Sequence, residues 1–186
     1  METKIINKRI VGYFLLVLVY AVGVVLIGRM GGAFGLVKHF GLWLGFFLLV
    51  RHRHILVEWL LHSHSSTLVV YLLCALPLML FEENINCLPS GCHLIPVTIP
   101  FLVIFLVLIY GIIRMTKVRA LWYVLVPACS VGLLWELTWG VSGSVFRALP
   151  LPWFIYIALW TWMSYAFFTI VPVQYLLRRS NRLANK

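Results

Sequence analysis

Hydrophobic residues follow one another along this chain in long continuous runs, which short polar connections separate. A transmembrane helix needs about 20 mainly apolar residues, and continuous runs indicate helices, whereas alternating ones indicate barrel strands. The pattern predicts six transmembrane helices, at residues 10–28, 34–50, 67–81, 97–113, 120–139 and 153–177. Because no long polar segment interrupts them, we expect residues 1–186 to form a single transmembrane helical domain.

Composition agrees with this pattern. Hydrophobic residues make up 63% of the 186 positions and charged residues only 11%, against about 25% charged in an ordinary soluble domain. The mean hydropathy is +1.01, and a soluble fold of this size could not bury so much apolar surface. The predicted fold class is therefore an all-α polytopic integral membrane protein. The 5 acidic residues are all glutamates, which excludes chemistry that requires an aspartate.

Basic residues set the predicted orientation, because the cytoplasmic loops of membrane proteins are enriched in Lys and Arg. With six helices, only Arg29, Lys38 and Arg147 of the 15 basic residues fall on one side. Both termini are therefore predicted to be cytoplasmic, in a multi-pass protein of the cell membrane. The same bias explains the net charge of +10, so nucleic acid is not an expected partner. The run at 10–28 is longer than a typical signal-peptide core, and we interpret it as an uncleaved anchor.

The segment 51–66 combines a short apolar stretch with histidines at His52, His54, His62 and His64. It is predicted either to lie along the cytoplasmic surface as an amphipathic helix or to extend the third transmembrane helix. The histidines fit a wet interfacial face. A metal site is the alternative, although the two rings of a helical His-x-His pair point about 200° apart and suit one ion poorly.

The cysteines differ between the spans and the loops. Cys74 and Cys129 lie within predicted spans, where cysteine usually behaves as a small hydrophobic residue. Cys87 and Cys92 flank a Leu-Pro-Ser-Gly turn in a predicted external loop, where thiols oxidise. We therefore predict a Cys87–Cys92 disulfide. A metal site built from both thiols and His93 is the alternative, but no separate second pair of ligands accompanies it, and no metal site is predicted.

Ionisable residues inside transmembrane segments are costly, which makes them candidates for function. The predicted spans contain Lys38, His39 and Glu136, and counting from the span ends places all three roughly 5–8 Å below the outer surface. We expect an outward-facing polar pocket in which Glu136 and His39 are the catalytic candidates and handle protons or a cation.

The substrate-binding candidates of this pocket are Lys38, Glu82, Glu83 and Arg147. The two basic side chains would attract an anionic headgroup or carboxylate, and the two glutamates would rim the mouth. A purely structural interpretation remains open. In that case Lys38 reaches the outer headgroups, and Glu136 pairs with Lys38 or Arg147 to hold two helices together.

Two short segments resemble motifs of known membrane-protein families. Val-Lys-His-Phe at 37–40 and Leu-Leu-Trp-Glu-Leu at 133–137 resemble VanZ-like membrane proteins, but the acidic residue expected before the lysine is missing. Residues 140–146 are similar to the rhomboid protease motif G-x-S-G-x-x-F, but no histidine follows His93 that could activate Ser142. Neither resemblance covers enough of the chain to define its family.

Two classes of function follow. In the first, the protein handles a lipid or small molecule, as a transporter component or a membrane enzyme. The small six-helix substrate-binding subunits of vitamin transporters have this size and topology. In the second, it is a non-catalytic structural subunit of a larger membrane complex. Membrane lipids are the expected partners, together with other membrane subunits in the second class, and no cofactor is identified.

Overall fold

The computed structural model describes residues 34–86, 95–116, 118–138 and 147–184. Its helices are α2 (Phe34–Leu61), α3 (Thr67–Asn86), α4 (Ile95–Met115), α5 (Leu121–Thr138) and α7 (Leu151–Ala184). In this part of the chain, five helices are long and apolar enough to cross a membrane. The expected class, an all-helical multi-pass membrane protein, is thereby supported. The predicted span at 10–28 lies outside the described residues, so the count of six helices stays a prediction.

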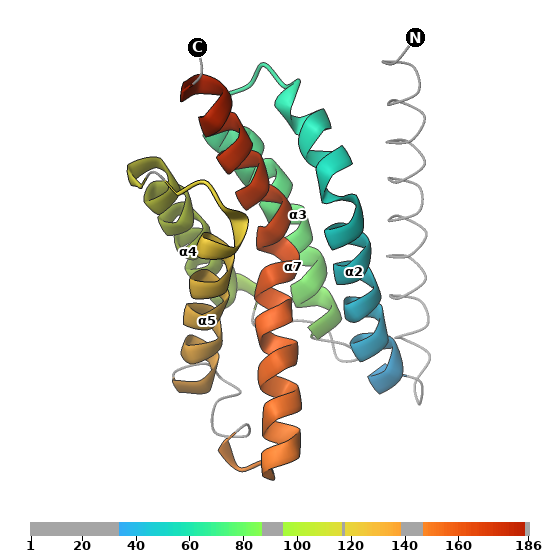
Figure 1. Cartoon of the computed structure of the whole chain (residues 1–186). Coiled ribbons are helices and arrows are strands. Elements are labelled where there is room, and N and C mark those ends of the chain that lie inside the picture. The colour runs from blue at the N-terminus through green and yellow to red at the C-terminus, as the bar shows by residue number, and fades with distance from the viewer. Residues whose placement is uncertain (1–33, 87–94, 117, 139–146, 185–186) are drawn as a thin grey trace.

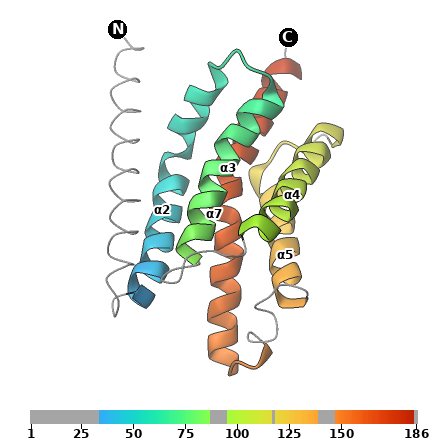
Figure 2. The same cartoon turned by 180° about the vertical axis from the view of Figure 1, so that it is seen from behind.

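Helix α7 runs through the middle of the bundle. Figures 1 and 2 show α2 and α3 on one side of it and α4 and α5 on the other, and α7 packs against all four. Every residue from Met163 to Leu177 is buried, as expected for a helix that is surrounded by apolar neighbours. Among the described residues, α2 and α5 do not pack against each other, because α7 lies between them.

Successive helices run in opposite directions. The α2–α3 turn, the α4–α5 connection and the C-terminal part of α7 therefore meet at one end of the bundle (Figure 1). We call this the basic end. Its arginines are Arg51, Arg53, Arg114, Arg119, Arg178, Arg179 and Arg182. The charge bias expected from the sequence is thus present in the arrangement of the described helices, while the side of the membrane that the basic end faces stays a prediction.

The segment after residue 50 corrects one prediction. It neither lies along the surface as a separate helix nor extends the third transmembrane helix; instead, it continues α2 as far as Leu61. Residues 51–61 contain no Gly or Pro that would end a helix. The break comes only at the Ser-rich turn, where Ser66 Oγ accepts a hydrogen bond from the Val69 amide at 3.4 Å and caps the start of α3.

The other helices begin and end close to the predicted positions, with two extensions. Helix α3 continues past residue 81 through Glu82 and Glu83 to Asn86, and α7 continues past residue 177 to Ala184. Both extensions are polar and lie at helix ends, where hydropathy underestimates helix length. The extension of α3 matters most, because it places two carboxyl groups on a helix rather than in a loop.

Candidate functional site

Three glutamates converge on the middle of α7. Glu82 of α3 is only 3% exposed and accepts a hydrogen bond from the Ser164 hydroxyl. Glu136 of α5 accepts a hydrogen bond from the Tyr165 hydroxyl at 3.1 Å. Glu83 lies close enough to Glu136 for their charges to interact. All three carboxyl groups also lie close enough to Tyr165 to interact electrostatically with its hydroxyl. We call Glu82, Glu83 and Glu136 the carboxyl cluster.

Helix α5 brings its glutamate to α7 through a glycine one turn earlier. Gly132 and Glu136 are four residues apart and therefore share one face of the helix. The Tyr165 ring covers Gly132 so closely that a Cβ atom there would lie 2.4 Å from Tyr165 Cδ1. The ring can therefore lie flat along α5 and carry its hydroxyl to Glu136. Small residues at helix contacts commonly permit such close approach in membranes.

Aromatic side chains hold Tyr165 in this position. Phe105 of α4 meets the ring edge to face, with centroids 5.4 Å apart and an interplanar angle of 79°. Phe168, on α7 itself, lies at 5.6 Å. On the α3 side, Phe81 stacks on Phe167 at 5.9 Å, one residue before Glu82. Rings of α4 and α7 thus pack against Tyr165, while the Phe81–Phe167 stack joins α3 to α7 beside Glu82.

The remaining predicted site residues are only partly placed. Lys38 and His39 belong to α2, but their side chains lie outside the described residues. Because α7 separates α2 from α5, the structure does not bring the helix of His39 against the helix of Glu136. Arg147 does not pair with Glu136; its Nη1 donates to the Leu137 carbonyl at 2.7 Å, near the C-terminal end of α5 where a cation is favourable.

The cysteine and histidine predictions are tested only in part. Cys87, Cys92 and His93 lie outside the described residues, so the disulfide stays a prediction. Cys74 and Cys129 have free thiols inside the bundle, and Cys129 is buried. In the part of the chain with described positions, no group of three His, Cys, Asp or Glu side chains could hold a metal ion.

Ser164 and Tyr165 were not among the predicted site residues. Within an apolar span, one serine and one tyrosine fit an ordinary packed helix, and their depth alone does not distinguish them. The available signal was weak: Thr161, Ser164 and Tyr165 bring hydroxyl groups to adjacent turns of the same span. Hydroxyl groups within a span commonly form hydrogen bonds between helices.

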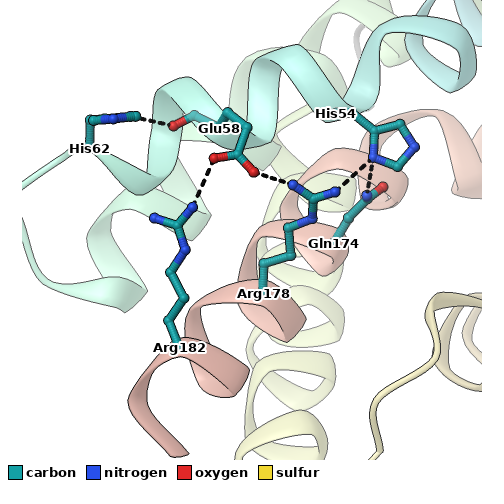
Figure 3. A network of polar contacts seen from close by, with 6 residues as sticks. All are labelled: His54, Glu58, His62, Gln174, Arg178 and Arg182. Atoms are coloured by element: carbon teal, nitrogen blue, oxygen red, sulfur yellow. Dashed lines mark hydrogen bonds and ion pairs between the residues drawn. The ribbon is translucent and has the colours of Figure 1, made fainter. Parts of the chain in front are cut away.

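A second polar network joins α2 to α7 at the basic end (Figure 3). Glu58 accepts from Arg178 and, at 2.8 Å, from Arg182. His54 Nδ1 lies 3.0 Å from both Arg178 Nη2 and Gln174 Nε2. Since a guanidinium and an amide NH₂ can only donate, Nδ1 must accept, and the proton of neutral His54 sits on Nε2. This network joins the part of α2 beyond residue 50 to the C-terminal part of α7.

Comparison with known proteins supplies no relative for this site. The chain matches no family model, and neither a curated protein sequence nor a solved structure is significantly similar to it. Its function must therefore be inferred from the geometry of its own side chains.

Proposed function

We propose that this chain is a six-helix protein of the cell membrane, with both termini cytoplasmic, that handles a lipid or small molecule at an outward-facing polar pocket. It acts there as a transporter component or a membrane enzyme. The observation that carries this proposal is the convergence of Glu82, Glu83 and Glu136 on two hydroxyl donors of α7 inside an apolar bundle. Ionisable groups at such depth are expensive, and structure alone rarely demands three of them.

The chemistry that fits this cluster is the uptake of a proton or an organic cation. Glu83 and Glu136 repel each other when both are charged, so one proton or one bound cation relieves the repulsion. Among the described residues, neither of them pairs with a Lys or Arg side chain. The Tyr165 hydroxyl beside Glu136 offers a route by which a proton could pass to a bound molecule.

The direct test is to purify the full chain with its native lipids and identify bound molecules by native mass spectrometry. A hydrophobic carbodiimide then reports carboxyl groups that hold a proton in an apolar setting. We expect wild-type protein to carry a bound molecule and to be labelled within the carboxyl cluster. Glu136→Gln should lose this bound molecule and the labelling of the carboxyl cluster. The matched substitution Glu58→Gln at the basic end should keep the bound molecule and the labelling.

Retention by Glu136→Gln of every molecule that the wild type binds would contradict the proposal. Recovery of the chain only within a stoichiometric complex of larger subunits, with no bound molecule, would instead favour a non-catalytic structural subunit.

A further inference from the structure

A pocket of about 350 Å³ opens at the basic end, between the C-terminal part of α7 and the facing parts of α2 and α5. Its polar and charged lining is formed by Arg53, His54, Arg119, Gln174, Arg178 and Asn181. Three arginines from three separate parts of the chain thus line one hollow, and no acidic residue lines it. This pocket is far along α7 from the carboxyl cluster, and its role is independent of the function proposed there.

The positive charge of this pocket is only partly neutralised by the protein. Arg178 shares Glu58 with Arg182, and Glu58 itself lies outside the lining. In the described chain, neither Arg53 nor Arg119 forms an ion pair with a carboxylate. Arginine is the side chain best suited to phosphate, because its planar donors match two phosphate oxygens at once.

Two lining residues of the pocket each have a buried polar atom without a hydrogen-bond partner. Nε of Arg53 lacks an acceptor, although its Nη1 donates to the Val50 carbonyl. Oε1 of Gln174 lacks a donor, and this side chain is only 8% exposed. Because buried polar groups are nearly always satisfied, a ligand that supplies an acceptor oxygen to Arg53 and a hydroxyl donor to Gln174 would complete the site.

The pocket lining includes a tryptophan, a residue typical of the level of lipid headgroups. Trp122 lines it and is 51% exposed, and half-exposed tryptophans are enriched at the boundary between hydrocarbon and water. The connection before α5 carries Arg119 at the same level. Basic pockets between transmembrane helices are suited to the headgroups of anionic lipids.

We propose that the pocket between α2, α5 and α7 at the basic end binds a phosphate ester that carries a hydroxyl group. Arg53, Arg119 and Arg178 hold the phosphate, and Gln174 accepts a hydrogen bond from the hydroxyl. The ligand is either the headgroup of an anionic lipid or a free phosphate ester of the same chemistry. A phosphatidylglycerol headgroup contains both required groups, so it is the first probe.

The test measures binding of three probes to the purified full chain by native mass spectrometry: phosphatidylglycerol, phosphatidylcholine and free glycerol phosphate. The pocket variants are Arg53→Gln and Arg119→Gln. The matched controls are Arg51→Gln and Arg114→Gln, which remove the same charge from exposed positions at the same end but outside the lining. Unfolding of each variant without added lipid reports whether it remains folded, and exposed Arg119 is the safer of the two pocket positions.

We expect each pocket variant to bind phosphatidylglycerol about tenfold more weakly than the wild type, which is the usual effect of losing one charged hydrogen bond. The controls should bind as the wild type does, and phosphatidylcholine should bind weakly to all of them. If glycerol phosphate binds to the wild type and the controls but more weakly to the pocket variants, the site is also supported, and its ligand is a soluble phosphate ester. Equal loss in pocket and control variants, or no preference of the wild type for either glycerol-bearing phosphate over phosphatidylcholine, overturns the proposal.

Discussion

The Tyr165 ring lies so close over Gly132 that any side chain at position 132 would overlap it. This contact is one of several between α5 and α7, and it brings the Tyr165 ring against the face of α5 where its hydroxyl meets Glu136. Gly132→Ala should therefore displace the ring and destabilise the protein by about 1–3 kcal/mol, the usual cost of overpacking. Thermal unfolding in detergent measures the effect.

Gly111 in α4 offers a matched control for that substitution. No atom lies within 4 Å of a Cβ built there, so Gly111→Ala adds a methyl group in open space. We expect it to be neutral or to stabilise the helix by about 0.5–1 kcal/mol, because alanine has the higher helix propensity. If both variants unfold at the same temperature, the close contact at Gly132 contributes nothing.

The hydrogen bond from Tyr165 to Glu136 can be removed without changing the packing. Tyr165→Phe keeps the ring against Gly132 and Phe105 but removes the hydroxyl. Interhelical hydrogen bonds in membranes contribute about 0.6 kcal/mol on average, so we expect a small but measurable loss of stability. Tyr123→Phe, at a position that is 78% exposed, should change nothing. If Tyr123→Phe lowered the stability more than Tyr165→Phe does, the hydrogen bond between Tyr165 and Glu136 would not be the cause of the loss.

The ion pairs of Glu58 should make a small contribution that depends on salt. The three side chains involved are 36–52% exposed, and such exposed pairs contribute at most about 1 kcal/mol. Glu58→Gln should destabilise the protein within that limit at low ionic strength. The difference from wild type should shrink at high salt, where the charges are screened. Unfolding measured at two salt concentrations tests this, and a difference that does not vary with salt would count against these ion pairs.

The predicted Cys87–Cys92 disulfide and the predicted orientation can be tested together. A membrane-impermeant maleimide, applied to intact cells, should label neither cysteine until a reductant is added, and should then label both. Cys74 and Cys129 lie inside the bundle and should stay unlabelled throughout. A variant with both loop cysteines replaced by alanine is the control. Labelling before reduction would contradict the predicted disulfide. Labelling only after the membrane is permeabilised would contradict the predicted orientation.

Much of the fold could be predicted from hydropathy, because membrane insertion is decided locally. The spans expected at 97–113 and 120–139 agree closely with Ile95–Met115 and Leu121–Thr138. Polar ends were harder to predict. Beyond residue 50, His54 and Glu58 of α2 contact residues of α7 that lie more than a hundred positions later in the chain, and hydropathy does not report such contacts.

The sequence identified the glutamates of the candidate site but not the residues that donate hydrogen bonds to them. The glutamates stand out because a charge in an apolar span is rare, whereas Ser164 and Tyr165 are ordinary residues until a carboxyl group is placed beside them. Their partners lie on α3 and α5, and no periodicity along the sequence links those helices to α7.

By itself, the sequence determined that this protein is built from apolar helices, where those helices lie along the chain and at which end its arginines gather. These properties depend on the transfer of each segment from water to lipid, which neighbouring residues decide. Only the tertiary structure decided which helix is central, how each helix is rotated about its axis and which side chains meet. Those choices depend on close packing between distant residues such as Gly132 and Tyr165, where the shape of both partners matters.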